Sequence, residues 1–153
     1  MSPVADAVAV RRAGPADLDA LDALETRAFA SDRLSRRSYR RLVSAPSARV
    51  LVAEAEGALA GSLVLLLRRG TGIARIYSLA VAPERRGGGI GATLARAAEA
   101  EAAAAGARGM SLEVRADNVP AARLYDRLGD RVVRTIEGYY ADGEAALRMR
   151  KAL

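Results

Sequence analysis

A run of glycines in the middle of the chain is the segment best suited to hold a ligand. It reads Arg86-Gly87-Gly88-Gly89-Ile90-Gly91 and lies between an apolar segment that predicts a strand and an alanine-rich segment that predicts a long helix. Glycine lets the backbone approach a ligand closely, and the first turn of a helix offers unpaired N–H groups and the positive end of the helix dipole. The run therefore predicts an anion site, most naturally for phosphates, although plain turns also contain glycine runs.

Glu113 is a candidate general base. In residues 110–114 the three apolar side chains would share one face of a strand, whereas Ser111 and Glu113 would point to the other. A central strand of an α/β fold usually has apolar groups on both faces, so a carboxylate there needs an explanation. Two explanations are open: the carboxylate transfers a proton, or it is structural and meets solvent or pairs with an arginine.

The composition excludes several other kinds of chemistry. The 153-residue chain has no histidine and no cysteine, and Lys151 is its only lysine among 24 basic residues. A Ser-His-Asp triad, a Cys-His pair, a disulfide framework, a zinc site of the usual ligands and a P-loop lysine are therefore excluded, and no metal is expected. An enzyme of this composition would take its acid and base from carboxylates, tyrosines, backbone groups or water.

Length and charge indicate one soluble domain over residues 1–153. The longest uncharged run, residues 57–67, is too short to span a membrane, and the N-terminal charge order is not that of a signal peptide. We therefore expect a cytoplasmic protein with no membrane contact. The net charge of +6 comes with an alanine and arginine bias typical of a GC-rich genome. It favours an anionic ligand, and no direct nucleic-acid binding is expected.

The elements that would position these residues form one mixed α/β pattern. Apolar segments predict strands at 8–12, 50–55, 59–67, 73–81, 110–114, 131–136 and 145–149, and helical spacing predicts helices at 16–29, 35–44, from the glycine run to about 105, and 119–128. Glu56-Gly57 predicts a hairpin. The expected fold class is α/β, with a single mixed central sheet flanked by helices and a strand–glycine loop–helix–strand unit at its centre.

A dinucleotide site is one interpretation of the glycine run. Gly87-x-Gly89-x-x-Ala92 satisfies the dinucleotide fingerprint, and Glu113 falls near the end of the next strand. However, the fingerprint should follow its strand directly, whereas residues 82–86 intervene. The chain after Glu113 is also too short for a second mononucleotide half and a substrate domain. This interpretation is the weaker one.

Two spaced blocks resemble the GNAT acetyltransferases. Residues 79–91, Leu-Ala-Val-Ala-Pro-Glu-Arg-Arg-Gly-Gly-Gly-Ile-Gly, resemble the acetyl-CoA motif Arg/Gln-x-x-Gly-x-Gly/Ala, which follows a strand and a proline. Residues 112–129 resemble the later strand–helix signature of the family, with Asn118 and Tyr125 at the family spacing. The segment Leu-Glu-Val-Arg-x-x-Asn and residues 138–144 most resemble the ribosomal-protein alanine N-acetyltransferases. The resemblance covers residues 73–153 well, and residues 1–72 only in the order of elements.

The resemblance implies the GNAT acyl-CoA N-acyltransferase fold and direct transfer of acetyl from acetyl-CoA to an amine, without a covalent enzyme intermediate. It implies Glu113 as base and Tyr125 as the acid that protonates the thiolate. Asn118 would contact the cosubstrate and, because Asn-x-Pro precedes a helix, would also cap that helix. The backbone of the strand would hold the pantetheine, with Val81 N–H able to polarise the thioester. The implied cosubstrate-binding residues are Leu79, Ala80, Val81, Arg86, Gly87, Gly88, Gly89, Ile90, Gly91, Ala92 and Asn118.

The acceptor is the least determined part of the prediction. An α-amino group needs only about 1 kcal/mol to be neutral at pH 7, against about 5 kcal/mol for a lysine, which favours a peptide N-terminus or a similarly weak small amine. The Pro-Trp that such N-terminal acetyltransferases tend to carry after the phenylalanine is replaced here by Ala30-Ser31, and Asp130 stands where the family usually has an aromatic residue. Arginines at 33, 36, 37, 40 and 41 form a stripe that is either a solvated face or a surface for an acidic acceptor.

Three functions follow in order of preference. The first is an N-acetyltransferase acting on a protein N-terminus or on a small-molecule amine. The second is a non-catalytic CoA-binding or ribosome-associated basic module on the same fold. The third is an NAD(P)-type dinucleotide protein. The sequence does not predict the oligomeric state.

Overall fold

A single seven-stranded sheet, in the order β1-β2-β3-β4-β5-β7-β6, organises the computed structural model, which describes residues 8–153. All neighbouring strands are antiparallel except β4 and β5, which are parallel. The strands are β1 (Ala9–Arg12), β2 (Ala48–Ala55), β3 (Ala58–Leu66), β4 (Ile73–Val81), β5 (Gly109–Arg115), β6 (Arg131–Ile136) and β7 (Ala146–Ala152). The helices are η2 (Pro15–Asp17), α1 (Leu18–Ala28), α2 (Arg36–Ser44), η3 (Pro83–Arg85), α3 (Ile90–Ala104) and α4 (Val119–Arg127).

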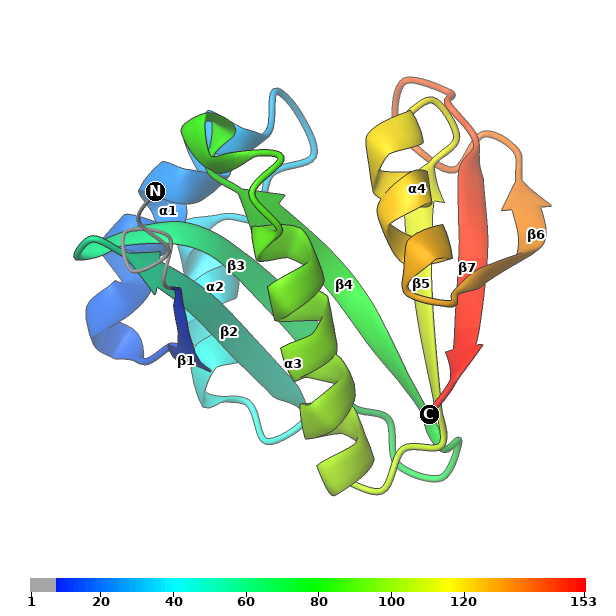
Figure 1. The fold of residues 1–153 in the computed structure, drawn as a ribbon, viewed down its shortest axis with the longest axis horizontal. Helices are drawn as coiled ribbons and strands as arrows, with labels where there is room; N and C mark the ends of the chain where they lie inside the picture. Colours follow the sequence, from blue (N-terminus) through cyan, green and yellow to red (C-terminus); the bar gives the residue numbers. More distant parts are fainter. Residues whose placement is uncertain (1–7) are drawn as a thin grey trace.

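The helices lie on both faces of the sheet (Figure 1). Helix α3 packs on β2, β3 and β4 from the front, and α4 lies on the same side over the C-terminal strands. Helices α1 and α2 pack on β2, β3 and β4 from behind. Strands β2 and β3 are therefore buried on both faces, which is why their sequences read as continuous apolar runs rather than as alternating ones. No helix within residues 8–153 is both long and apolar enough to cross a membrane.

A core of small residues brings α3 close to the sheet. The helix buries Ala95, Ala98 and Ala102 against the strands. At Gly61 of β3 an added Cβ would lie 2.9 Å from side-chain atoms of Ile90 and of Leu94, too close for any residue larger than glycine. The alanine-rich, aromatic-poor composition is thus used to pack the helix tightly, and this fixes the position of the α3 N-terminus relative to β4.

The two halves of the sheet separate between β4 and β5. Strand β4 pairs with β3 up to Val81 but with β5 only from Ile73 opposite Gly109 to Ile76 opposite Leu112. The next residue, Tyr77, has no partner in β3, because the register there shifts by one residue. Such a bulge bends the strand that carries it, and β4 turns away from β5 at this point (Figure 1). We call the resulting space between residues 77–81 of β4 and the upper end of β5 the wedge.

Most predicted elements are confirmed, and the largest differences in their bounds occur in three places. The helix expected at 16–29 begins as the 3-10 turn η2, which Pro15 starts, and continues as α1 up to Ala28. Strand β2 begins at Ala48, two residues earlier than expected. Strand β7 runs to Ala152 rather than to residue 149, because its alternating basic residues hide the strand pattern. The predicted domain also includes residues 1–7, which lie outside the described residues.

Candidate active site

The left wall of the wedge is the open edge of β4. Ala82 N–H donates to Ala60 O of β3 at 2.8 Å. Because backbone groups alternate in direction along an antiparallel strand, Ala80 also bonds toward β3, whereas the N–H and C=O groups of Leu79 and Val81 point into the wedge. Of the three residues expected to bind a cosubstrate through their backbone, the structure places two with free groups at the opening.

The glycine run forms the upper end of the wedge, at the N-terminus of α3. Gly87 and Gly89 have φ values of +84° and +85°, which favour glycine. Gly88 N–H donates weakly to Arg85 O at 3.3 Å, and the other amides from Gly87 to Ala92 have no acceptor within residues 8–153. Five unpaired N–H groups at the positive end of a 15-residue helix suit a phosphate group. The free amides that a phosphate cradle needs are therefore present, and their binding of a phosphate stays a prediction.

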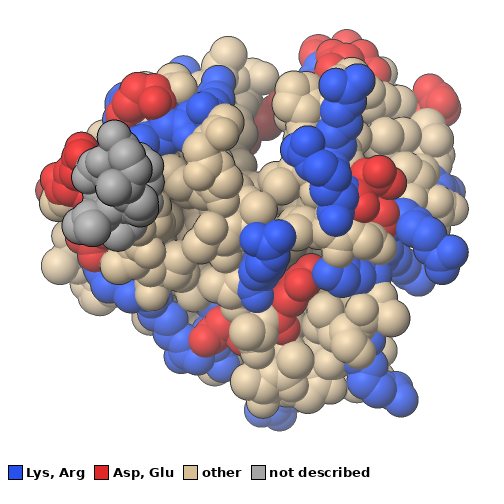
Figure 2. Space-filling model, viewed as in Figure 1, with Lys and Arg blue, Asp and Glu red and all other residues tan. Residues whose placement is uncertain are grey.

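Two contacts keep this loop in place and explain its other residues. The Arg86 guanidinium donates to Ala28 O at 3.0 Å and so binds the loop to the C-terminus of α1. Gly91 faces α4 across the wedge, and a Cβ at this position would lie 3.1 Å from Leu124 Cδ2. Arg86 thus has a structural contact as well as its predicted role at the pyrophosphate, and Gly91 allows α4 to approach α3. Figure 2 shows the opening between the two halves at this point, with basic side chains gathered over α4 on its right.

Glu113 lies at the closed end of the wedge and is held by two arginines. It follows Leu112, the last residue of β5 that pairs with β4. Arg75 of β4 donates Nε to Glu113 Oε1, and Arg148 of β7 donates Nε to Oε2, each at 2.8 Å. Only 6% of the glutamate side chain is exposed. The pairing with arginine that the sequence left open is present. Arg75 Nη2 also lies 2.6 Å from Oε1, so Oε2 is the oxygen with a lone pair left for water or an amine.

The side chain of Glu113 points to the back face of the sheet, where no helix of the described chain covers β5 and β7. Instead, the segment between β6 and β7 approaches it, because Arg75 Nη2 donates to Tyr139 OH at 3.1 Å. The neighbouring Tyr140 is partly buried. Burial raises its pKa, and the charges of Glu113 and of Asp32, from the segment between α1 and α2, raise it further. Two connecting segments therefore border the back of the site.

The α1–α2 segment is fixed by a buried glutamate. Glu25 is 2% exposed, accepts from Tyr39 OH at 2.6 Å through Oε1 and accepts from Leu34 N–H at 2.8 Å through Oε2. Burial is the main cause of the raised pKa of Tyr39, and the Glu25 carboxylate adds to it. This pair was not predicted from the sequence, although a glutamate among the leucines of the apolar face of α1 is a visible signal.

Tyr125 lies on α4 with its ring packed in the main core. It is 4% exposed, and its hydroxyl has no hydrogen-bond partner within residues 8–153. Burial raises its pKa, and the nearby charge of Asp130 raises it further, so the phenol keeps its proton at neutral pH. Asn118 Oδ1 accepts from Ala121 N–H at 3.3 Å, which confirms its predicted role as the N-cap of α4.

The arginine stripe is divided between two functions. Arg33 precedes α2, and its guanidinium donates to Phe29 O at 2.6 Å, so it caps the end of α1 instead of extending the stripe. Arg36 pairs with Asp19 at 2.7 Å. The remaining members, Arg37, Arg40 and Arg41, have no ion pair within residues 8–153, as expected for a solvated face.

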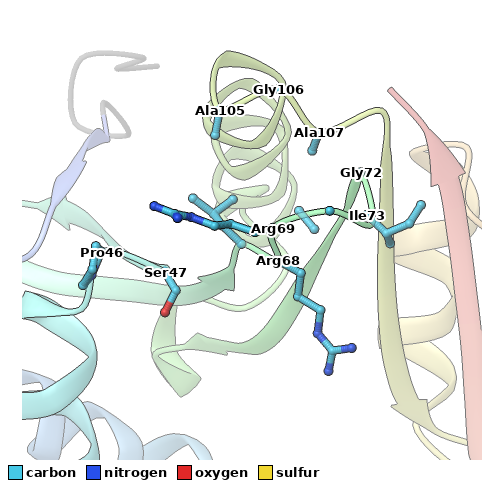
Figure 3. Close-up of a pocket in the computed structure, with 12 residues that line it drawn as sticks. Pro46, Ser47, Arg68, Arg69, Gly72, Ile73, Ala105, Gly106 and Ala107 are labelled. Carbon is cyan, nitrogen blue, oxygen red and sulfur yellow. The ribbon is translucent and has the colours of Figure 1, made fainter.

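A cavity of about 450 Å³ lies at the other end of the sheet, near the C-terminus of α3 (Figure 3). Its lining includes Pro46, Gly72 and Gly106 and contains none of the predicted site residues. A smaller cavity of about 260 Å³ does contain Glu113. The predicted site residues therefore lie around the wedge and at the smaller cavity beside it.

The open strand edge, the free amides and the carboxylate all lie around the wedge. The chain belongs to the GNAT acetyltransferase family, whose model matches residues 17–130. It is 37% identical over 142 residues, 92% of this chain and 93% of the relative, to a Bacillus subtilis protein named as a putative ribosomal protein bS18-alanine N-acetyltransferase. An N-alpha-acetyltransferase of Saccharolobus solfataricus is 39% identical over 89 residues, which cover 58% of this chain and 51% of the relative.

The fold also matches the folds of solved structures. The ribosomal-protein-S18-alanine N-acetyltransferase of Escherichia coli matches with a TM-score of 0.85 and 25% identity, over 95% of this chain and 94% of the other. The prediction of the GNAT fold is confirmed, and the protein is an acetyl-CoA-dependent N-acetyltransferase. The dinucleotide interpretation and the non-catalytic module are accordingly set aside.

Proposed function

We propose that this enzyme acetylates the α-amino group of a protein N-terminus, with Glu113 as its general base. The observation that carries the proposal is the position of Glu113: it is the first β5 residue beyond the β4 ladder, and it faces the open back of the sheet. An amine entering from the back would meet this carboxylate before it reaches the wedge. Making an α-amine neutral at pH 7 requires about 1 kcal/mol, which one positioned carboxylate can provide.

The cosubstrate fits the groups of the wedge. The five free amides between Gly87 and Ala92 would bind the pyrophosphate, and the backbone groups of Leu79 and Val81 would pair with the pantetheine as an added strand would. We expect the thioester oxygen to lie near Val81 N–H, which would stabilise the negative charge that develops on this oxygen. Asn118, which begins α4, would contact the cosubstrate from the opposite wall.

Proton transfer would involve two residues. Glu113, or a water that it holds, takes a proton from the amine as the nitrogen attacks the thioester carbonyl. The carbon–sulfur bond then breaks, and Tyr125 donates its phenolic proton to the thiolate. Burial keeps the Tyr125 phenol protonated before the reaction, as a proton donor requires, while the raised pKa also makes it a weaker acid. The two arginines position the Glu113 carboxylate, and Oε2, which accepts one hydrogen bond within residues 8–153, keeps a lone pair.

Two relatives support an N-terminal acceptor, since their names specify a ribosomal-protein alanine and an α-amine. The test is acetylation of peptides that each contain a free N-terminus and one internal lysine, analysed by fragment mass spectrometry. We expect one acetyl group, on the first residue. Nα-blocked peptides and a set of polyamines and aminoglycosides are the controls, and modification of these instead of the free N-terminus would contradict the proposal.

A further inference from the structure

The back face of the C-terminal half of the sheet is lined with arginine. In the strand register, Ser111 of β5 lies opposite Arg150 of β7, which lies opposite Arg131 of β6. Directly opposed residues of neighbouring strands share a face of the sheet. The same relationship holds for the next row, Glu113, Arg148 and Arg134. Of these two rows, one side chain is acidic and four are basic.

A cavity of about 260 Å³ joins this face to the proposed base. Its charged lining consists of one carboxylate, Glu113, and four arginines, Arg68, Arg75, Arg148 and Arg150. Arg75 and Arg148 are used by Glu113, as described above. Arg68 and Arg150 make no hydrogen bond or ion pair within residues 8–153. The cavity therefore has an excess of three positive charges, two of them on guanidinium groups free to bind a ligand.

The third polar group of the cavity is Ser111. It is 8% exposed, and its hydroxyl has no hydrogen-bond partner within residues 8–153. Because it lies between Arg75 and Arg150 in the register, its hydroxyl and the free guanidinium groups border the same space. A hydroxyl without a partner beside two unpaired guanidinium groups is suited to a carboxylate, which accepts several hydrogen bonds at once.

We propose that the acceptor is an acidic N-terminus, whose second or third residue places a carboxylate on Arg68, Arg150 and Ser111 while its α-amine lies at Glu113. This inference rests on the proposed function, because Glu113 locates the amine. Arg150 is two residues beyond Arg148 on β7, a distance of about 7 Å along the strand. That distance corresponds to about two residues of an extended peptide, so an aspartate or glutamate at position 2 or 3 reaches the free arginines.

The arginines farther out on the back face would also bind the rest of such an acceptor. Arg131 and Arg134 extend the same surface to the β6 edge, and both are exposed. Further acidic residues of the acceptor would meet these two arginines in sequence. Attraction of this kind is weakened by salt, because the outer arginines are open to solvent.

The test compares peptides that differ only in charge. The wild-type enzyme is assayed with three peptides that share a first residue and carry Asp-Glu, Asn-Gln or Lys-Lys at positions 2 and 3. We expect kcat/KM for the acidic peptide to exceed that for the neutral one by roughly tenfold or more, the value of one hydrogen bond between charged groups. In Arg68→Gln/Arg150→Gln the ratio should fall to near one, while turnover of the neutral peptide is retained.

The matched control is Arg69→Gln. Arg69 is exposed like its neighbour Arg68, and Figure 3 shows the two side chains extending in different directions. It does not line the cavity at Glu113, so its removal should leave the preference intact. Equal turnover of the three peptides, or a preference for the basic one, would overturn the inference and leave N-terminal acetylation standing.

Direct binding separates the inference from the proposed function. Fluorescence anisotropy of the labelled acidic peptide, in the presence of CoA, should show binding that Arg68→Gln/Arg150→Gln weakens roughly tenfold and that added salt weakens further. If no peptide is acetylated but this binding is seen, the proposed function fails and the anionic site stands. If a short RNA displaces the peptide and binds more tightly, the face is a nucleic-acid surface and the inference is wrong.

Discussion

Arg148 and Glu113 lie directly opposite each other on β7 and β5, and Arg148 Nε donates to Glu113 Oε2 at 2.8 Å. The carboxylate is thus oriented by a neighbour in its own sheet, and Arg75 fixes its other oxygen from β4. A carboxylate held in this way would lose little conformational entropy on meeting an acceptor, as our proposal of Glu113 as general base requires. Because Glu113 lies where β4 and β5 separate, it is the first residue to substitute.

We expect Glu113→Gln to lower kcat by about 10²- to 10⁴-fold, the usual contribution of a general base. Binding of acetyl-CoA, measured by isothermal titration, should be unchanged, because the amide cradle lies elsewhere. The control is Glu137→Gln, which alters an exposed glutamate with no side-chain partner in the described chain. Wild-type turnover in Glu113→Gln, at any pH between 6 and 9, would remove Glu113 from the mechanism.

Loss of the hydroxyl should lower activity at Tyr125 and stability at Tyr39. Tyr125→Phe keeps the packed ring and removes the proton donor, so we expect kcat to fall by about 10²-fold with little change in thermal stability. Tyr39→Phe removes a hydrogen bond to the buried Glu25, so it should cost about 1–3 kcal/mol of unfolding free energy. Activity assays and denaturant unfolding of both variants test the pair, and a Tyr125→Phe enzyme of full activity would exclude the proposed acid.

Gly89 and Gly57 provide a matched test of the phosphate cradle. Both have φ near +80°, and an added Cβ would meet no atom within 4 Å at either site. Each alanine substitution should therefore cost about 1 kcal/mol of stability through backbone strain. Only Gly89→Ala should weaken binding of acetyl-CoA, by roughly tenfold, because only Gly89 lies among the free amides. Equal affinities in titrations of the two variants would place the pyrophosphate elsewhere.

Asp130 should make stability depend on pH. Burial, with the nearby charge of Glu99, raises its pKa to about 6, while Lys151 opposes the shift. The folded state then binds more protons than the unfolded state between pH 4 and 6, so this residue lowers stability as the pH rises through that interval, and the loss is complete above about pH 6. We expect Asp130→Asn to raise Tm more at pH 8 than at pH 5.

The control for this pH effect is Asp126→Asn, at an exposed position of α4. Its Tm difference from the wild type should be small and the same at both pH values, as for most surface substitutions. If Asp130→Asn shifts Tm equally at pH 5 and pH 8, the charge of Asp130 is not the cause of its effect.

Much of the fold could be predicted because local signals were strong. The strand 73–81 has the predicted bounds, and the Glu56-Gly57 turn has the two positive φ values, 54° and 78°, that join twisted strands in a tight hairpin. The glycine run was recognisable because its sequence is unusual and a helix follows it. These features depend on residues close together in the chain.

Apart from the Glu25–Tyr39 pair, the features that were missed depend on pairing between distant strands. Nothing local to Arg75 or Arg148 indicates that both reach Glu113, since this follows from the register of three strands. Beyond the bulge at Tyr77, the β4 residues that pack on the main core change from even positions, Ala74 and Ile76, to odd ones, Leu79 and Val81. The sequence hides this change, because Ile73 and Ala80 are apolar as well.

The short parallel ladder between β4 and β5 has a mechanical consequence. Four residue pairs connect the two halves of the sheet, from Ile73 opposite Gly109 to Ile76 opposite Leu112. A molecule bound along Leu79 and Val81 would connect the two halves of the sheet beyond these four pairs. A ligand that binds only the folded state adds about 2.7 kcal/mol of stability when its concentration is a hundredfold above Kd. The folded enzyme would then persist longer at higher concentrations of acetyl-CoA. The cosubstrate would both donate the acetyl group and stabilise the fold.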